Sequence, residues 1–317
     1  MDRHDTSPMQ KPIGIIGVGA IGSCVASHLL KANKPVGLFD IDERKVAIFE
    51  SPPATIFRNL KEVACSCNVV ILSLPTPEII SEVVLGDSGL ISSTTGRLTI
   101  IDLSTNSVDN AKKIGEECRR TGNSYLDSPI TGGIWGAQRG DLTVMVGGDE
   151  DDYKRVLPIL RYFGRVIIYV GPHGYGAATK LIHNMLGEIQ VHSIAEAFCL
   201  AAVLNLNIDK TFSVISHGMA SSKILTELYG NGVLTGDFTP NATVDSAEKD
   251  QRLLRDIANG AGFKLTFTPI ITERIRQLRE KGFGSMDVTS VLLLFEETYG
   301  VVARFSSYYE KKNKRTT

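Results

Sequence analysis

In this chain of 317 residues, the pair that best suits catalysis by residue type and spacing is Lys180 and Asn184. The two polar residues lie one helical turn apart. They follow a glycine-rich turn, Gly171–Gly176, that leads into a long apolar segment. A spacing of four places an ammonium and a carboxamide on one face of a helix. A lysine amine can exchange a proton with a hydroxyl, and an amide can hold the reacting oxygen. The pair predicts acid–base chemistry, although an exposed helical lysine without function fits the same spacing.

A glycine pattern near the N-terminus predicts a dinucleotide site, which would supply the matching hydride chemistry. Gly17, Gly19 and Gly22 form Gly-x-Gly-x-x-Gly between a strand candidate and a helix candidate. The first glycine permits a tight turn, the second lets the backbone approach a pyrophosphate, and the third lets helix and strand pack closely. Ala20 and Ile21 lie in the first helical turn, where backbone N–H groups are expected to face the phosphates.

Asp40 ends the second strand candidate and is expected to bind the ribose hydroxyls of the cofactor. Its negative charge would repel a 2′-phosphate, so we expect NAD to be preferred, with NADP possible. One alternative is that Asp40 caps the helix that begins near Asp42. Another is that Arg44, one turn beyond Asp40, accommodates the phosphate of NADP.

Further candidates follow three other strand candidates. Leu74 and Pro75 follow one of them, and Ser104 and Thr105 follow the next. In an open α/β sheet, residues beyond the carboxyl ends of the strands face the ligand crevice. Ordinary turn and cap chemistry fits the same residues equally well.

The third of these loops, 127–140, is rich in glycine and follows another strand candidate. Thr131, Gly132 and Gly133 stand where small residues and an early helical turn would form a nest of backbone N–H groups, which suits a carboxylate. A glycine-rich connection without any ligand is the alternative.

The elements that must position these residues fall into two parts. Up to Tyr169, apolar runs alternate with helical stretches, which is typical of a parallel, doubly wound α/β sheet. The strand candidates are Ile13–Gly17, Val36–Phe39, Val69–Leu72, Leu98–Ile101, Ser124–Leu126, Leu142–Val146 and Val166–Tyr169, and the helix candidates between them are Ile21–Lys31, Glu43–Glu50, Glu78–Val84, Val108–Arg120 and Glu150–Phe163.

After Gly176 the pattern becomes helical, without strand alternation. The helix candidates there are Ala177–Val203, Ile208–His217, Ser221–Tyr229, Thr243–Gly260, Pro269–Lys281 and Asp287–Tyr299. We therefore expect an N-terminal Rossmann domain over residues 11–172, an all-helical domain for substrate binding and oligomerisation over 173–306, and a disordered tail over 307–317.

Five motifs in order resemble those of the β-hydroxyacid dehydrogenase family, the group of 3-hydroxyisobutyrate dehydrogenase and tartronate semialdehyde reductase. They are the dinucleotide loop Gly17–Gly22, the substrate loop Asp127–Gly140, the catalytic segment Gly174–Asn184, the pair Lys249-Asp250 and the stretch Gly282–Asp287. The resemblance covers nearly the whole chain and implies hydride transfer between NAD(H) and a small 3-hydroxy acid or its semialdehyde.

The resemblance also implies roles for single residues. Lys180 exchanges the hydroxyl proton and Asn184 holds the reacting oxygen. The substrate carboxylate is expected to be positioned by Ser104, Thr131, Gly132 and Gly133. The cofactor is expected to be contacted by Leu74, Pro75, Thr105 and Lys249.

Two departures from the family pattern leave alternatives open. Thr131 stands where serine is usual, and His183 stands where the family often has the first of two asparagines. Lys-x-x-His-Asn also resembles the catalytic segment of 6-phosphogluconate dehydrogenases. Imine reductases, another related group, usually lack the lysine found here as Lys180. A dinucleotide-binding scaffold without catalysis is the non-enzyme alternative.

Composition restricts the remaining classes. A net charge of −1 gives no support for a nucleic acid or a membrane surface as partner. The five cysteines are scattered, which indicates free thiols in a reducing cytoplasm and no metal site. Apolar residues on several sides of the segment from Ala177 predict a buried subunit contact, and the resemblance likewise implies a homodimer or homotetramer.

Overall fold

The computed structural model describes residues 11–49 and 54–310. The chain divides into two compact units, an N-terminal unit that ends at Lys180 and a helical unit that begins at Leu181. This division falls inside helix α9 (Tyr175–Val203), whereas the boundary expected from the sequence, 172/173, lies just before that helix. The two units are described separately below.

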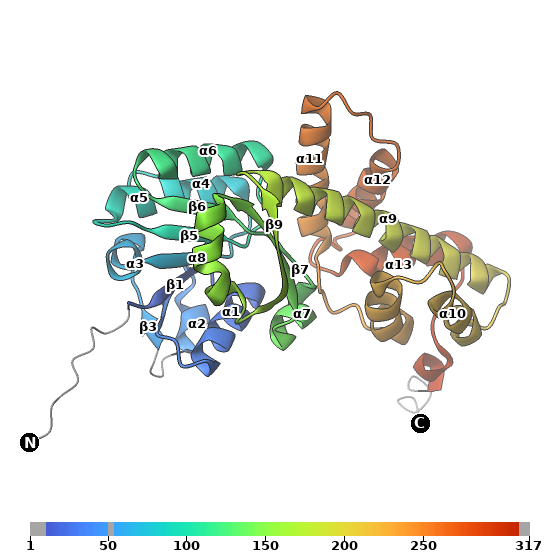
Figure 1. Cartoon of the computed structure of the whole chain (residues 1–317). Coiled ribbons are helices and arrows are strands. Elements are labelled where there is room, and N and C mark those ends of the chain that lie inside the picture. The colour runs from blue at the N-terminus through green and yellow to red at the C-terminus, as the bar shows by residue number, and fades with distance from the viewer. Residues whose placement is uncertain (1–10, 50–53, 311–317) are drawn as a thin grey trace, which may run out of the picture. The chain divides into compact units, whose positions relative to one another are not determined.

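Nine strands form one sheet in the N-terminal unit (Figure 1). They are β1 (Ile13–Ile16), β2 (Val36–Phe39), β3 (Ala54–Ile56), β4 (Val69–Leu72), β5 (Thr99–Asp102), β6 (Ser124–Asp127), β7 (Ile130–Thr131), β8 (Leu142–Gly148) and β9 (Gly164–Gly171). Their spatial order is β3-β2-β1-β4-β5-β6-β8-β7, and β9 pairs with β8. Every strand predicted from an apolar run is present, and the predicted α/β class is confirmed.

The sheet is not wholly parallel, which corrects the sequence-based expectation. Strands β1 to β6 pair in parallel, but β8 runs antiparallel to both β6 and β7. Ten residues separate the end of β7 from the start of β8, which is shorter than the dozen or so that a parallel crossover needs. The short strands β3 and β7 were not predicted, because neither has an apolar run long enough to stand out.

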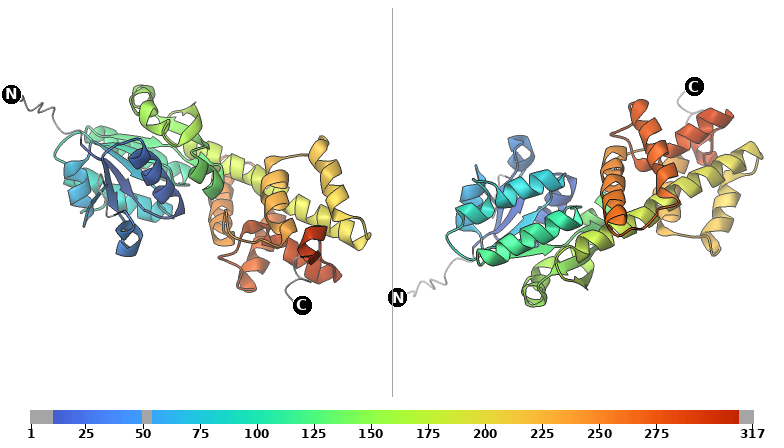
Figure 2. Two further views of the ribbon diagram at one scale, coloured as in Figure 1. Left: turned by 90° about the horizontal axis from the view of Figure 1, so that it is seen from below. Right: turned by 90° about the horizontal axis from the view of Figure 1, so that it is seen from above.

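Helices cover both faces of this sheet (Figure 2). They are α1 (Ala20–Lys31), α2 (Glu43–Ala47), α3 (Leu60–Ser66), α4 (Pro77–Leu85), α5 (Leu90–Ser93), α6 (Val108–Arg120), α7 (Gly133–Arg139) and α8 (Glu150–Leu160). One buried apolar cluster joins Ile15 of β1 to α1, α2, α7 and α8, and a second joins Ile16 to α3, α4, α5 and α6. Successive strand residues thus serve opposite faces, as the pleat requires.

The strand order reverses direction at β1, which lies between β2 and β4. The chain builds β1, β2 and β3 outward on one side and then returns to place β4 on the other side. Loops that leave the carboxyl ends of neighbouring strands diverge at such a switch point and leave a crevice for ligands. The glycine loop after β1 and the loop after β4 therefore flank the expected ligand site.

The helical unit contains most of α9 together with shorter helices (Figure 1). These are α10 (Ile208–His217), the π-helical segment η1 (Ile224–Tyr229), the 3-10 segments η2 (Val233–Thr235) and η3 (Val288–Ser290), α11 (Val244–Gly260), α12 (Thr268–Glu280) and α13 (Val291–Tyr299). Phe198 and Tyr229 are both buried in the apolar core of this unit and stack with their ring centroids 6.4 Å apart. The predicted helical character is confirmed for this unit.

The start of the predicted tail differs from the expectation. Residues 306–310 are helical rather than irregular. The Ser306 hydroxyl donates to Asp209, and Phe305 packs edge-on against Phe212 with a centroid separation of 5.1 Å. These contacts anchor the chain past residue 305, and residues 311–317 lie outside the described residues.

Candidate functional site

The loop after β1 has the shape that a dinucleotide requires. A Cβ at Gly17, whose φ is +87°, would lie 2.2 Å from the Ser73 carbonyl oxygen, and one at Gly22 would lie 2.0 Å from that of Gly17. Within the described residues, no heavy atom lies within 4 Å of the corresponding position at Gly19. Gly19 is also the N-cap of α1 and has no side chain to cap it. The loop therefore combines tight packing with open backbone at the start of a helix. Ala20 and Ile21 form the first helical turn.

Asp40 is built into this loop. Its carboxylate accepts hydrogen bonds from Val18 N at 2.8 Å and from Asp42 N at 2.9 Å, and Lys45 Nζ lies 3.5 Å away. Only 6% of the side chain is exposed. The second strand end is thereby tied to the glycine loop, with a carboxylate held beside it.

The helix-cap alternative for Asp40 is wrong, because Asp42 is the N-cap of α2 and accepts from Arg44 N. Asp42 also forms a bidentate ion pair with the Arg44 guanidinium, with N–O distances of 2.8 and 2.9 Å. The hydrogen bond from Arg44 lowers the pKa of Asp42. Arg44 is therefore occupied by a neighbouring carboxylate in this structure.

Ser104 links two of the predicted loops. Its hydroxyl oxygen accepts a hydrogen bond from Leu74 N at 2.9 Å, and its own N–H donates to Asp102 at 3.0 Å. The adjoining Pro75 is exposed and Thr105 is half-buried. The carboxyl ends of β4 and β5 are thus held together by the residue that the sequence predicted as a substrate contact.

A buried polar network below Ser104 was not predicted. Asp102 accepts hydrogen bonds from Tyr125 Oη at 2.7 Å and from Asn106 Nδ2 at 3.3 Å. Burial raises the pKa of Asp102 to about 6. The available signal was a carboxylate at the end of an apolar run, where an unpaired charge would be costly.

The substrate loop, residues 127–140, begins at a second buried carboxylate, that of Asp127. Thr131 ends β7, and Gly132 and Gly133 follow with φ of +122° and +60°. Gly132 is the N-cap of α7 and carries no side-chain cap. The predicted glycine turn at the start of a helix is therefore present, and its binding of a carboxylate stays a prediction.

The start of α9 is fixed on the sheet by Asp127, which ends β6. Its carboxylate accepts from Gly174 N at 3.0 Å and from Ala177 N at 2.9 Å. A Cβ at Gly176 would lie 2.1 Å from the Asp127 carbonyl oxygen and 2.8 Å from that of Met145. The helix therefore approaches the sheet as closely as backbone allows, and Lys180 follows one turn later, half-buried.

Asn184, also on α9, has a defined orientation within the helical unit. Its Nδ2 donates to Asp250 Oδ2 at 2.6 Å, and its Oδ1 lies 3.1 Å from Nδ1 of the exposed His183. Lys249, which precedes Asp250 on α11, has its ammonium 3.5 Å from Asp250 Oδ1 and is 16% exposed. The Lys-Asp pair noted in the sequence thus positions Asn184, a role that no local pattern revealed.

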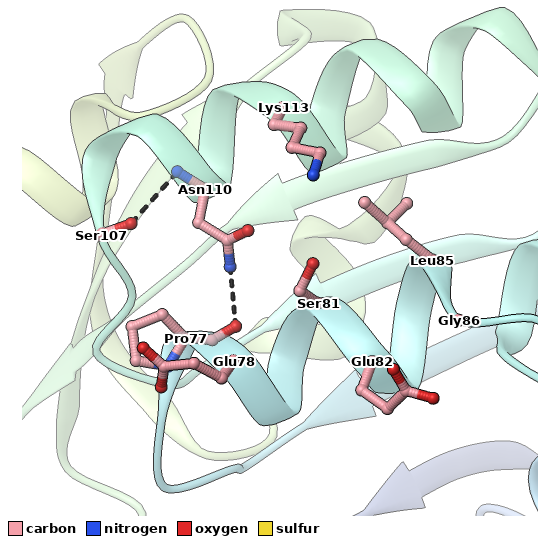
Figure 3. Close-up of a pocket in the computed structure, with 9 residues that line it drawn as sticks. All are labelled: Pro77, Glu78, Ser81, Glu82, Leu85, Gly86, Ser107, Asn110 and Lys113. Atoms are coloured by element: carbon pink, nitrogen blue, oxygen red, sulfur yellow. Dashed lines mark hydrogen bonds between the residues drawn. The ribbon is translucent and has the colours of Figure 1, made fainter.

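A shallow hollow of about 590 Å³ lies elsewhere, between α4 and α6 (Figure 3). Asn110 Nδ2 bridges it by donating to the Pro77 carbonyl oxygen at 2.9 Å, and Glu82 and Lys113 are among its polar walls. None of the residues predicted to bind cofactor or substrate lines it. The glycine loop and the α9 junction, rather than this hollow, define the candidate site.

Two further features bear on the class of protein. Within residues 11–49 and 54–310, no group of three or more His, Cys, Asp or Glu side chains could hold a metal ion. In the same part of the chain, α9 is long and apolar enough to cross a membrane by length and composition alone. A core helix of a soluble protein passes the same test, and the start of α9 is hydrogen-bonded to the sheet.

Comparison with protein families gives two matches that together cover most of the chain. Residues 12–171 match the NAD-binding domain of 6-phosphogluconate dehydrogenase. Residues 174–295 match the NAD-binding domain of NADP-dependent 3-hydroxyisobutyrate dehydrogenase. The two matches divide the chain just before α9.

Individual proteins agree with these matches. The chain is 30% identical to 2-(hydroxymethyl)glutarate dehydrogenase of Eubacterium barkeri over 91% of its own length and 96% of the relative. It is 29% identical to 3-sulfolactaldehyde reductase of Escherichia coli, over 92% of the chain and 98% of the relative. A solved structure of Mycobacterium tuberculosis 3-hydroxyisobutyrate dehydrogenase with L-serine has a TM-score of 0.80 at 26% identity, covering 90% of this chain and 99% of that one.

Proposed function

The chain belongs to the β-hydroxyacid dehydrogenase family, and from that premise we propose that it transfers hydride between NAD(H) and a small 3-hydroxy acid or its semialdehyde. The observation that carries the proposal is the anchoring of α9 by Asp127. It starts the helix that bears Lys180 at the carboxyl edge of the sheet, where the dinucleotide loop also lies. An acid–base group and a cofactor loop then belong to one unit.

In the proposed reaction, proton transfer, binding of the reacting oxygen and binding of the substrate carboxylate are assigned to different residues of the chain. In oxidation Lys180 takes the hydroxyl proton, and in reduction it returns that proton. Asn184 holds the reacting oxygen, with its amide oriented by Asp250. When bound, the nicotinamide supplies the acceptor or donor of hydride. The substrate carboxylate is assigned to Ser104, Thr131, Gly132 and Gly133, and the contact of Lys249 with the cofactor stays a prediction.

Initial rates against a substrate panel test this proposal. The panel holds 3-hydroxy acids and their semialdehydes, each with NAD(H) and NADP(H), and includes 6-phosphogluconate and cyclic imines as competing substrates. We expect turnover of at least one unphosphorylated 3-hydroxy acid or semialdehyde. Turnover of 6-phosphogluconate or an imine alone would assign the chain to a related activity. Binding of dinucleotide without turnover of any panel member would favour a scaffold.

We further propose that NAD is preferred to NADP. The carboxylates of Asp40 and Asp42 lie at the end of β2, and Asp42 holds Arg44 in a bidentate ion pair. Replacing Asp40 by serine removes a charge that repels the 2′-phosphate, so the ratio of kcat/KM for NAD to that for NADP should fall about tenfold or more, equivalent to roughly 1.4 kcal/mol. Both cofactors should bind somewhat more weakly, because the bond to Val18 N is also weakened.

Asp42→Asn is the matched variant for this measurement. It leaves Asp40 in place and releases Arg44, so it should improve the use of NADP without loosening the glycine loop. A wild-type protein that prefers NADP would show that Arg44 outweighs Asp40 and would overturn this assignment.

The exposed surface of α9 supports a homo-oligomer, either a dimer or a tetramer. Leu186 and Leu200 on α9 and Leu204 directly after it are 53%, 56% and 59% exposed, although Leu181 and Phe198 are buried. The later helices therefore do not wrap α9 completely. A C2 contact between helical units would cover such a surface.

Light scattering tests the predicted oligomer. Leu200→Glu should lower the mass of the assembly, whereas a wild-type mass of 34.4 kDa would contradict any oligomer. A cytoplasmic location likewise remains a proposal.

A further inference from the structure

Six buried side chains in the described part of the helical unit have a polar atom without a hydrogen-bond partner, and four of them lie on α9 and α11. Glu188 and His192 on α9 are each 9% exposed, and Asp250 and Gln251 on α11 are 9% and 1% exposed. The atoms without a partner are Glu188 Oε2, His192 Nε2, Asp250 Oδ1 and Gln251 Oε1. Buried polar atoms are nearly always bonded in native proteins, so this group needs an explanation. Three of the four atoms are oxygens of carboxyl or amide groups, and the cluster therefore lacks donors.

This cluster adjoins the residue proposed to hold the reacting oxygen. Asn184 and Glu188 are one helical turn apart on α9 and share a face of that helix. Asn184 Nδ2 donates to Asp250 Oδ2 at 2.6 Å, while the other oxygen of Asp250 lacks a hydrogen bond. Lys249 lies 3.5 Å from that oxygen, within ion-pair distance but without hydrogen-bond geometry. A donor to Asp250 Oδ1 would complete the shell that orients Asn184.

Charge balance selects the group that supplies this donor. Burial, together with the charges of Asp250 and Asp287, raises the pKa of Glu188 to about 8. Burial lowers the pKa of His192 to about 4, so the imidazole is neutral and brings no positive charge. Asp287 already accepts from Asn241 N at 2.8 Å and Thr289 Oγ1 at 2.7 Å. Glu188 is accordingly the buried carboxyl that holds a proton at neutral pH.

We propose that Glu188 is a positioning residue whose neutral carboxylic acid supplies the hydrogen-bond donor that Asp250 lacks, and so fixes the carboxylate that orients Asn184. The inference rests on the proposed function, because it acts through the role given to Asn184. Glu188 itself touches neither substrate nor cofactor in this assignment.

The groups around Glu188 leave it as the one expected to titrate in the mildly alkaline range. On α11 these are Asp250 and Lys249, and Asp287 stands before η3. His192 lies on its own helix. Tyr229 of η1 donates to the Val191 carbonyl oxygen at 2.6 Å, and burial raises its pKa well above the usual value, so it stays protonated. Since the folded-state pKa of Glu188 is raised, its neutral form is present below about pH 8 and is lost above it.

Two substitutions and a matched control test the proposal in the oxidation direction. Glu188→Gln keeps a donor that cannot ionise, and Glu188→Leu removes the donor. Glu196→Gln removes a carboxylate from an exposed position two turns further along α9. The kcat of the wild type should fall above about pH 8 as Glu188 ionises. Glu188→Gln should abolish this alkaline fall, while the control keeps it.

Below about pH 8, where the wild type holds the neutral donor, Glu188→Leu should lower kcat by about 10- to 100-fold with little change in the KM for cofactor, the range expected when a reacting group is misplaced. Circular dichroism checks that it folds, and if it does not, Glu188→Gln decides. An alkaline fall retained in Glu188→Gln, or a kcat for folded Glu188→Leu within twofold of wild type, would overturn the positioning role.

An infrared measurement keeps this outcome separate from failure of the proposed function. The wild type at pH 7 should show the C=O stretch of a protonated buried carboxyl, and Glu188→Gln should lack it. Absence of that band from the wild type would overturn the proposal. A wild type that shows the band but turns over no hydroxy acid would refute the proposed function and leave the protonated carboxyl established.

Discussion

Replacing Lys180 by alanine is expected to lower kcat by about 100-fold or more, the contribution typical of a positioned acid–base group. The dissociation constant for NAD should change little, because the glycine loop and Asp40 are built from other elements. The helix should also persist, since alanine has the highest helix propensity and the Asp127 contacts that anchor α9 involve Gly174 and Ala177. Steady-state kinetics and calorimetric titration with NAD measure the two quantities.

Controls for this variant separate proton transfer from charge. Lys180→Arg keeps the positive charge but has no amine that can become neutral near pH 7, so it should be nearly as impaired as the alanine variant. Small primary amines should restore part of the activity of Lys180→Ala. Lys264→Ala, at an exposed position, should behave as wild type. Turnover within fivefold of wild type in folded Lys180→Ala would remove the lysine from the mechanism.

The glycine loop and the helix that bears Lys180 were predictable from the sequence because each depends on local rules. The tight turn, the apolar run before it and the helix after it all lie within Ile13–Lys31. The strands that are buried on both faces were recognisable for the same reason. Strand β8 was also recognised, but its antiparallel direction was not, because that direction depends on the short connection between β7 and β8.

The polar contacts that set the site were largely beyond sequence reasoning. Asn184 and Asp250 lie 66 positions apart in the chain, and Asp102 and Tyr125 lie 23 apart. The local sequence pattern shows that the carboxylates of Asp102 and Asp250 are unusual in apolar surroundings. It does not predict which donor forms a hydrogen bond with each of them. The role of Asp250 in orienting Asn184 therefore emerged only from the packing of α11 on α9.

Two glycine substitutions, at the N-cap of α1 and in its first turn, should have opposite consequences for folding and for cofactor binding. In Gly22→Ala the new methyl carbon would lie 2.0 Å from the Gly17 carbonyl oxygen, and backbone atoms cannot yield without opening the loop. We expect the free energy of unfolding to fall by about 1–3 kcal/mol, as in overpacked cores, or by more. Gly19→Ala meets no heavy atom within 4 Å in the part of the chain that the structure describes, and its φ of −75° and ψ of −163° suit alanine. Its stability should be unchanged or slightly higher.

For NAD binding, Gly19→Ala should have the larger direct effect, because the open space at Gly19 is where the backbone must approach the pyrophosphate. Gly19→Ala should therefore raise the dissociation constant for NAD about tenfold or more, a loss of roughly 1.4 kcal/mol, while its melting temperature without cofactor stays at the wild-type value. Gly22→Ala should lose melting temperature first and bind NAD weakly as a result. Thermal denaturation with and without NAD, combined with calorimetric titration, separates the two effects. If Gly19→Ala bound NAD as tightly as the wild type, the pyrophosphate would have to lie away from the N-terminus of α1, and the cofactor site assigned to this loop would be wrong.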